Sequence, residues 1–228
     1  MDTDSLRWDE IHKKIPPDLE RHSQYAEKRE VLFPRESKIC DMAGGLGYDA
    51  MYFIGKGHNV IILDISDYAL KGAVNSAKAS KISKKLAVKK CDFGTGKIPL
   101  KDGSVDVVFS RIGFNYFPYK ETRLLLAEAY RILKTDGKAF IAFKSPEDVE
   151  DYKFLKTNAV ELERNVFVEG EQIRSRFTKE QLQQMMEEIG IVDYSVEQFL
   201  EERDTIRDEF MKANKNILYL NEVRFKKI

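Results

Sequence analysis

The sequence contains only two cysteines, Cys40 and Cys91, in 228 residues. Two cysteines cannot build the disulfide framework of a small secreted protein, and they cannot form a four-cysteine zinc site, so we expect no metal. No apolar stretch approaches the ~20 residues of a membrane-spanning helix. The N-terminus is polar, with Asp2 and Asp4, and does not resemble a secretion signal. These absences predict a cytoplasmic protein without a membrane partner.

An excess of charge of one sign is also missing, because 38 basic residues balance 38 acidic ones. A balanced chain has no overall attraction for a polyanion, so we expect no nucleic-acid partner. The length suits one sizeable domain, or one domain with an added segment. It leaves the oligomeric state open.

Short apolar runs alternate with helical patterns from about Pro34 to Phe143. The runs predict five strands, at 38–42, 59–64, 86–92, 105–110 and 138–143, and the patterns between them predict helices at 48–56, 67–79 and 121–133. Strands separated by helices imply a mainly parallel sheet. In the tail, Thr178 and Gln181 resemble a capping box that opens a helix, and 191–199 and 217–226 could be two more strands. The expected fold class is α/β, with a seven-stranded sheet flanked by helices.

A glycine-rich segment follows the first predicted strand and precedes a helix. It reads Asp41-Met42-Ala43-Gly44-Gly45-Leu46-Gly47. Glycines there allow a sharp turn and let a ligand approach the backbone closely. Such a loop alone is a weak signal, since a structural turn can have the same composition.

Acidic residues end three successive predicted strands: Asp41, Asp64 and Asp92. In a parallel sheet all three lie at the carboxyl edge, where open α/β sheets bind ligands. An acid beside the glycine loop suits an ammonium group, one after the second strand suits a ribose diol, and one after the third suits an adenine amine. Ribose, adenine and an amino acid together describe S-adenosylmethionine, although each aspartate taken singly could be only a turn or cap residue.

The stretch from about Lys38 to Phe143 resembles the core of class I S-adenosylmethionine-dependent methyltransferases. The glycine segment is similar to their first motif, with Ala43 where many members have glycine and Gly44 where many have another small residue. Asp64-Ile65 resembles the ribose-binding segment, and Cys91-Asp92-Phe93 resembles the adenine-contacting one. The resemblance implies a Rossmann-like fold, S-adenosylmethionine as cofactor and S-adenosylhomocysteine as product. The implied cofactor-binding residues are Asp41, Ala43, Gly44, Gly45, Gly47, Asp64, Ile65, Cys91, Asp92, Phe93 and Ser110.

A nicotinamide dinucleotide is the main alternative ligand, because Gly45 to Ala50 also matches G-x-G-x-x-A and Asp64 follows at a suitable distance. A pyrophosphate, however, prefers a loop without negative charge. Asp41 and Asp49 make this loop acidic, which suits a ligand with a sulfonium and an ammonium group. The alternative also leaves Asp92 unexplained.

In the family, the exit of the fourth strand faces both the cofactor and the methyl acceptor. Arg111, Phe114, Asn115 and Tyr116 are therefore the expected substrate-binding residues, although the aromatic ones could only pack against the next helix. The segment from Asn115 to Pro118 is not the N/D-P-P-Y/F motif of some amino-methylating members. We expect a small-molecule acceptor, with a protein side chain as the second alternative.

No catalytic residue is fixed by the sequence. The candidates are His22, Tyr25, Arg111 and Tyr116. The expected organisation is one methyltransferase domain over 1–228: an N-terminal lid segment at 1–35, a cofactor-binding core at 36–145, an insertion or lid at 146–177 and the C-terminal part of the sheet at 178–228.

Overall fold

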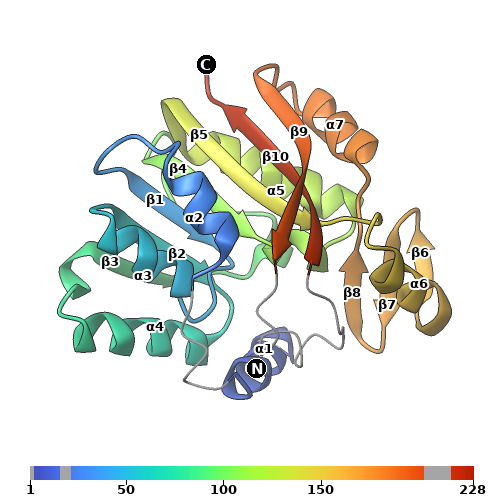
Figure 1. Ribbon diagram of the computed structural model, residues 1–228, viewed down its shortest axis with the longest axis horizontal. Coiled ribbons are helices and arrows are strands. Elements are labelled where there is room, and N and C mark those ends of the chain that lie inside the picture. Colours follow the sequence, from blue (N-terminus) through green and yellow to red (C-terminus); the bar gives the residue numbers. More distant parts are fainter. Residues whose placement is uncertain (1–2, 16–21, 203–216) are drawn as a thin grey trace.

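The protein is built around one large sheet, shown in Figure 1. The computed structural model describes residues 3–15, 22–202 and 217–228. The seven strands lie in the order β3-β2-β1-β4-β5-β10-β9. Their bounds are β1 Lys38–Met42, β2 Asn59–Asp64, β3 Leu86–Lys90, β4 Val105–Arg111, β5 Leu133–Lys144, β9 Tyr194–Glu202 and β10 Ile217–Lys226. Strands β1 to β5 pair in parallel, and β10 is antiparallel to both β5 and β9.

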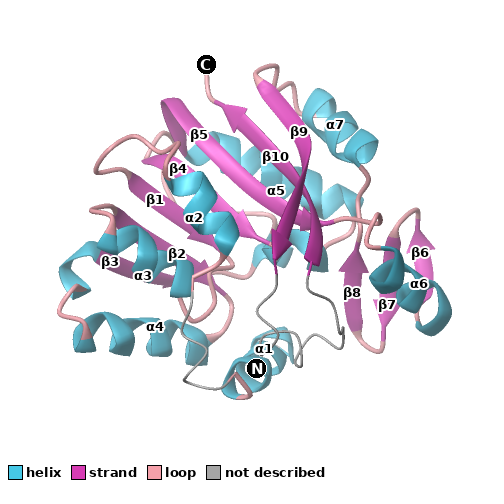
Figure 2. Cartoon of the chain, in the orientation of Figure 1, coloured by secondary structure: helices cyan, strands magenta, loops and turns pink. Residues whose placement is uncertain are grey.

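Helices cover both faces of this sheet, because successive strand residues point apolar side chains to opposite faces. Ile39, Val107 and Phe109 pack on the face covered by α2 (Gln24–Glu30), α3 (Tyr48–Gly55) and α4 (Asp67–Ala79). Cys40 and Val108 point to the other face, which α5 (Tyr119–Ile132) and α7 (Lys179–Glu188) cover. Because side chains alternate along a strand, a strand buried on both faces has a continuous apolar run. Figure 2 shows α2 and α3 in front of the sheet and α5 behind it.

The expected fold class is confirmed by this three-layer architecture. The predicted strands at 38–42, 59–64 and 217–226 and the helix at 67–79 have the predicted bounds. Thr178 and Gln181 form the capping box at the start of α7.

The fifth strand differs from the prediction, because it begins at Leu133 rather than at Lys138. Leu133 already pairs with Val105, and the register of the two strands shifts before Lys138 pairs with Val107. Asp136 keeps the positive φ of a turn residue, at 65°. Its backbone N–H donates to the carbonyl of Lys227 at 2.8 Å. The predicted turn is therefore a distortion within a longer strand.

The charged segment after β5 forms a small unit of its own. Helix α6 (Val149–Asn158) is followed by three antiparallel strands, β6 (Val160–Glu163), β7 (Val166–Glu169) and β8 (Gln172–Ser175). These strands are only four residues long, so their apolar pattern did not predict them. At the N-terminus, α1 (Thr3–Lys13) lies beside the edge of the large sheet where the parallel strands end (Figure 1).

Candidate active site

The glycine loop joins β1 to α3 in a conformation that few residues adopt. Ala43, Gly45 and Gly47 have φ of 56°, 54° and 79°. A Cβ on Gly44 would lie 2.5 Å from the Oδ2 atom of Asp41, and one on Gly47 would lie 2.7 Å from a methyl group of Ile62. The loop therefore needs small residues at these positions, whether or not a ligand is bound.

Asp41 ends β1 and is only 2% exposed. Its Oδ2 atom is buried and has no hydrogen-bond partner in the described part of the chain. Burial raises the pKa of Asp41 well above its usual range, and the nearby carboxylates of Asp49 and Asp64 raise it further. An ammonium group brought to this carboxylate would supply both the missing partner and the missing positive charge.

Asp64 ends β2 and is held in one orientation by the backbone. Its Oδ2 accepts from the N–H of Gly45 at 2.8 Å, and its Oδ1 accepts from the N–H of Ser66 at 2.9 Å. Burial raises the pKa of Asp64, while the Ser66 N–H and His12 act in the opposite direction. A carboxylate has about four acceptor sites, so Asp64 retains capacity to accept from a ligand hydroxyl.

The third acidic residue, Asp92, follows β3 and caps a short turn, with Oδ1 accepting from the Gly94 N–H at 2.8 Å. Its neighbour Cys91 is buried, and burial together with Asp92 and Asp64 raises the pKa of the Cys91 thiol to about 12. Such a thiol is protonated at neutral pH and does not act as a nucleophile. Ser110, at the end of β4, donates to the carbonyl of Met42 at 2.8 Å.

The ends of β2 and β3, with Asp64 and Asp92, form the floor of a cavity of about 520 Å³, whereas Asp41, Cys91 and Ser110 are not among its lining residues. This volume is typical of small-molecule sites. The walls come from the loop after β4, from α1 and from the turn between β7 and β8. The lining residues are Asp4, Arg7, Trp8, His12, Ala43, Asp64, Ile65, Asp92, Phe93, Gly94, Arg111, Ile112, Gly113, Tyr116, Phe117, Pro118, Glu121, Glu171, Gln172 and Ile173.

Helix α1 is fixed against the loop that follows β2. Asp9 accepts from the Ser66 hydroxyl at 2.6 Å and from the Tyr68 N–H at 3.0 Å. The Ser5 hydroxyl donates to the carbonyl of Ile65 at 3.0 Å. On the other side, Arg7 lies 3.4 Å from Glu171 in the β7–β8 turn. The helix and the turn together roof the cavity.

Two of the four expected substrate-binding residues line this cavity, Arg111 and Tyr116. The Tyr116 ring meets the Trp8 ring edge-on, with 4.7 Å between centroids. Arg111 donates to Glu201 of β9 at 2.8 and 2.5 Å, so its guanidinium is held by the C-terminal part of the sheet. The other two, Phe114 and Asn115, are buried and do not line the cavity.

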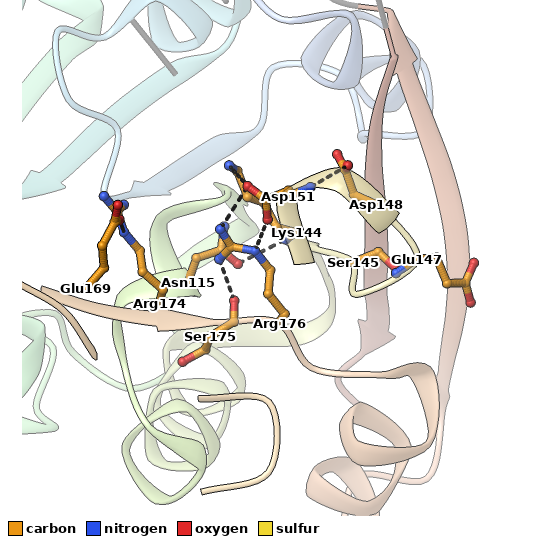
Figure 3. Close-up of polar contacts among 10 residues, drawn as sticks. All are labelled: Asn115, Lys144, Ser145, Glu147, Asp148, Asp151, Glu169, Arg174, Ser175 and Arg176. Atoms are coloured by element: carbon orange, nitrogen blue, oxygen red, sulfur yellow. Dashed lines mark hydrogen bonds and ion pairs between the residues drawn. The ribbon is translucent and has the colours of Figure 1, made fainter. Parts of the chain in front are cut away.

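Asn115 belongs to a buried polar cluster that joins the small sheet to the large one (Figure 3). Its Oδ1 accepts from the Lys144 N–H at 2.9 Å, at the end of β5. Asp151 of α6 accepts from Lys144 at 3.3 Å and from Arg176 at 2.5 Å. Burial disfavours ionisation of Asp151, but Arg176 and Lys144 outweigh burial and lower its pKa. The cluster fixes the small sheet, and with it the β7–β8 turn, over the cavity.

The other two candidate catalytic residues lie elsewhere. Tyr25 is fully buried in the core, and its hydroxyl donates to Glu222 at 2.8 Å. The His22 ring stacks on Tyr52, with 4.0 Å between centroids, and neither lines the cavity. The N-terminal residues that do line it include Trp8 and His12, from α1. The contribution of the β7–β8 turn left no signal in the sequence, because it depends on how the small sheet packs.

The chain resembles known proteins in sequence over one region and in fold over most of its length. Residues 39–137 match the model of a methyltransferase domain family. A solved S-adenosylmethionine-dependent methyltransferase of Methanosarcina mazei has 18% identity and a TM-score of 0.68, over 86% of this chain and 94% of that one. A 1,6-didemethyltoxoflavin-N1-methyltransferase of Burkholderia thailandensis, solved with S-adenosylhomocysteine, has 12% identity and a TM-score of 0.68, over 99% and 87%. No curated protein sequence matches the chain.

The fold is thus that of an α/β enzyme with its ligand site at the carboxyl edge of the sheet. Residues 39–137 match a methyltransferase domain, and the fold of the whole chain is similar to that of solved S-adenosylmethionine-dependent methyltransferases. The site fits that cofactor, because the buried Oδ2 of Asp41 has no hydrogen-bond partner among residues 3–15, 22–202 and 217–228 and can accept from an ammonium group.

Proposed function

We propose that the protein transfers a methyl group from S-adenosylmethionine to a small-molecule acceptor. The observation that carries this proposal is the roofed cavity. Trp8 from α1 and Ile173 from β8 line the cavity together with Asp64 and Asp92, and its volume is about 520 Å³. The cavity has to hold the cofactor beside Asp64 and Asp92 as well as the acceptor, so the remaining room suits a small molecule, whereas a folded protein surface does not enter it.

The residues that would hold the cofactor follow from the site. Asp64 would accept hydrogen bonds from the ribose, Asp92 and Phe93 would border the adenine, and Asp41 would attract the ammonium group. The bound cofactor supplies a methyl group already activated by the sulfonium. The chain therefore mainly has to align the acceptor for in-line displacement, which can supply a large share of the rate.

Arg111 and Tyr116 stand on the acceptor side of the cavity and remain our candidates for orienting the acceptor. If the acceptor carries a proton, Tyr116 is the candidate group for hydrogen bonding to it. We leave open whether oxygen, nitrogen or carbon receives the methyl group.

The dinucleotide alternative finds less support. The dinucleotide-binding order 3-2-1-4-5-6 is mostly parallel, whereas here the antiparallel strand β10 follows β5.

In the described residues no helix is both long and apolar enough to cross a membrane. We keep the cytoplasm, and the absence of a nucleic-acid partner, as predictions that rest on composition.

The test is methyl transfer from S-adenosylmethionine labelled on its methyl group to a cell extract separated by ultrafiltration. After the small molecules are separated by chromatography, we expect the label in a compound other than S-adenosylmethionine, and less of it with the Tyr116→Ala and Arg111→Ala variants. Label in the protein fraction alone would contradict a small-molecule acceptor. Full label with both variants would contradict the assignment of the acceptor side.

A further inference from the structure

His12 lies at the cofactor side of the cavity although it comes from the N-terminal helix. It stands in the last turn of α1 and lines the cavity together with Asp64. A Cβ built on Gly45 would lie 2.9 Å from Cε1 of His12, so the imidazole rests on the glycine loop. The acceptor-side residue Tyr116 instead meets Trp8, one turn earlier on the same helix.

The position of the ring is fixed by contacts on either side of it. Asp9, three residues earlier, is hydrogen-bonded to the Ser66 hydroxyl and the Tyr68 N–H. Ser66 also donates its N–H to Asp64. The same short loop therefore orients both the carboxylate of Asp64 and the helix that carries His12.

The imidazole has an unused hydrogen-bonding atom. Its Nδ1 is buried and has no partner in residues 3–15, 22–202 and 217–228. A buried nitrogen in this state is unfavourable and calls for an explanation, which a ligand group entering beside Gly45 would provide.

The protonation state of His12 suits a hydroxyl ligand. Burial lowers the pKa of His12, although the charges of Asp64 and Asp9 raise it. The neutral ring has one N–H donor and one acceptor nitrogen. A hydroxyl group can satisfy either nitrogen, while the Asp64 carboxylate beside it can only accept.

We propose that His12 binds the ribose hydroxyls of the cofactor together with Asp64, so that the N-terminal helix completes the ribose site. The proposal rests on the proposed function, because it presumes an adenosyl ligand. It assigns His12 to cofactor binding and not to proton transfer from the acceptor.

The test measures binding of S-adenosylhomocysteine by calorimetry to the full chain and to His12→Ala, His12→Asn and His22→Ala. We expect His12→Ala to weaken binding about 3- to 10-fold, the range of one hydrogen bond. His12→Asn keeps a polar atom near the Nδ1 position and should retain more of the affinity. His22→Ala is the matched control, since His22 lies outside the cavity on Tyr52, and it should bind as the wild type does.

A second measurement separates a contact from a merely structural role. Adenosine, 2′-deoxyadenosine and 3′-deoxyadenosine are each competed against S-adenosylhomocysteine. We expect the wild type to prefer adenosine over at least one deoxy compound, and His12→Ala to lose part of that preference. An unchanged preference would overturn the proposal even if overall affinity falls, because removal of a ribose contact must reduce it.

Two other results have clear meanings. Equal or tighter binding of S-adenosylhomocysteine by His12→Ala would overturn the proposal, and tighter binding would show that the ring occupies cofactor space. If the wild type binds no S-adenosylhomocysteine, the proposed function itself fails and the inference falls with it.

Discussion

At the scale of single residues, Asp64 combines a fixed orientation with remaining acceptor capacity. Backbone N–H groups of Gly45 and Ser66 hold its two oxygens. Replacing Asp64 with alanine should weaken S-adenosylhomocysteine binding at least 10-fold, since hydrogen bonds to a charged group contribute about 1.5–3 kcal/mol. Asp67→Ala, three residues later on exposed helix surface, is the control. Unchanged affinity in Asp64→Ala, measured by calorimetry, would mean that the ribose lies elsewhere.

Ala43 shows a different property of the same loop, because it is a non-glycine residue with φ of 56°. The left-handed conformation costs an L-residue roughly 1–2 kcal/mol, whereas glycine raises the entropy cost of folding by about 0.4–1 kcal/mol. Ala43→Gly should therefore stabilise the protein by about 0.5–1 kcal/mol in urea unfolding. Ala73→Gly, inside helix α4, should destabilise it. Destabilisation by both substitutions would show that the Ala43 methyl group contributes more by packing than it costs.

At the scale of elements, the small sheet depends on the buried cluster around Asp151. Arg176 is 3% exposed and forms an ion pair with the Asp151 carboxylate. Lys144 forms a second ion pair with the same carboxylate. Asp151→Asn leaves two buried cations short of a negative charge, which should cost about 3 kcal/mol of unfolding free energy. Asp102→Asn, which removes an exposed partner of Arg131, should leave the urea midpoint unchanged.

The same cluster predicts how stability depends on pH. The pKa of Asp151 is lowered in the folded protein. Its contribution to the free energy of unfolding is therefore fully present above the unfolded pKa of about 3.9, and it is lost as pH falls through the folded pKa. The difference between the wild type and Asp151→Asn should therefore be constant from about pH 5 to 7 and shrink below about pH 4. A difference that grows in acid would contradict this assignment.

The elements also show which patterns the sequence can reveal. Strands such as β2, buried on both faces, have a continuous apolar run, and α4 has alanines at helical spacing, so both have their predicted bounds. Strand β9 runs from Tyr194 to Glu202, later than the predicted 191–199, because its exposed glutamates pair with β10 without an apolar signal. Strands β6 to β8 are too short to show a period.

At the scale of the whole molecule, the strand ends that form the floor of the site can be predicted from the order of elements along the sequence. The roof, made by α1 and the β7–β8 turn, cannot. Parallel strands bring Asp41, Asp64 and Asp92 to one edge, which local sequence predicts. The roof instead depends on long-range contacts, such as that between Arg7 and Glu171, which no local pattern encodes. The sequence therefore does not show which residues of the expected N-terminal lid reach the site. Tyr25 is a candidate from the sequence, but the structure places it in the core.

The central claim is that the glycine loop and its three aspartates hold an adenosyl ligand with an ammonium group. Calorimetric titration of the protein with S-adenosylmethionine, S-adenosylhomocysteine and NAD(H) in parallel tests it most directly. We predict binding of the two adenosyl compounds and none of NAD(H). Binding of NAD(H) alone would contradict the account, because the loop would then hold a pyrophosphate beside the buried carboxylate of Asp41.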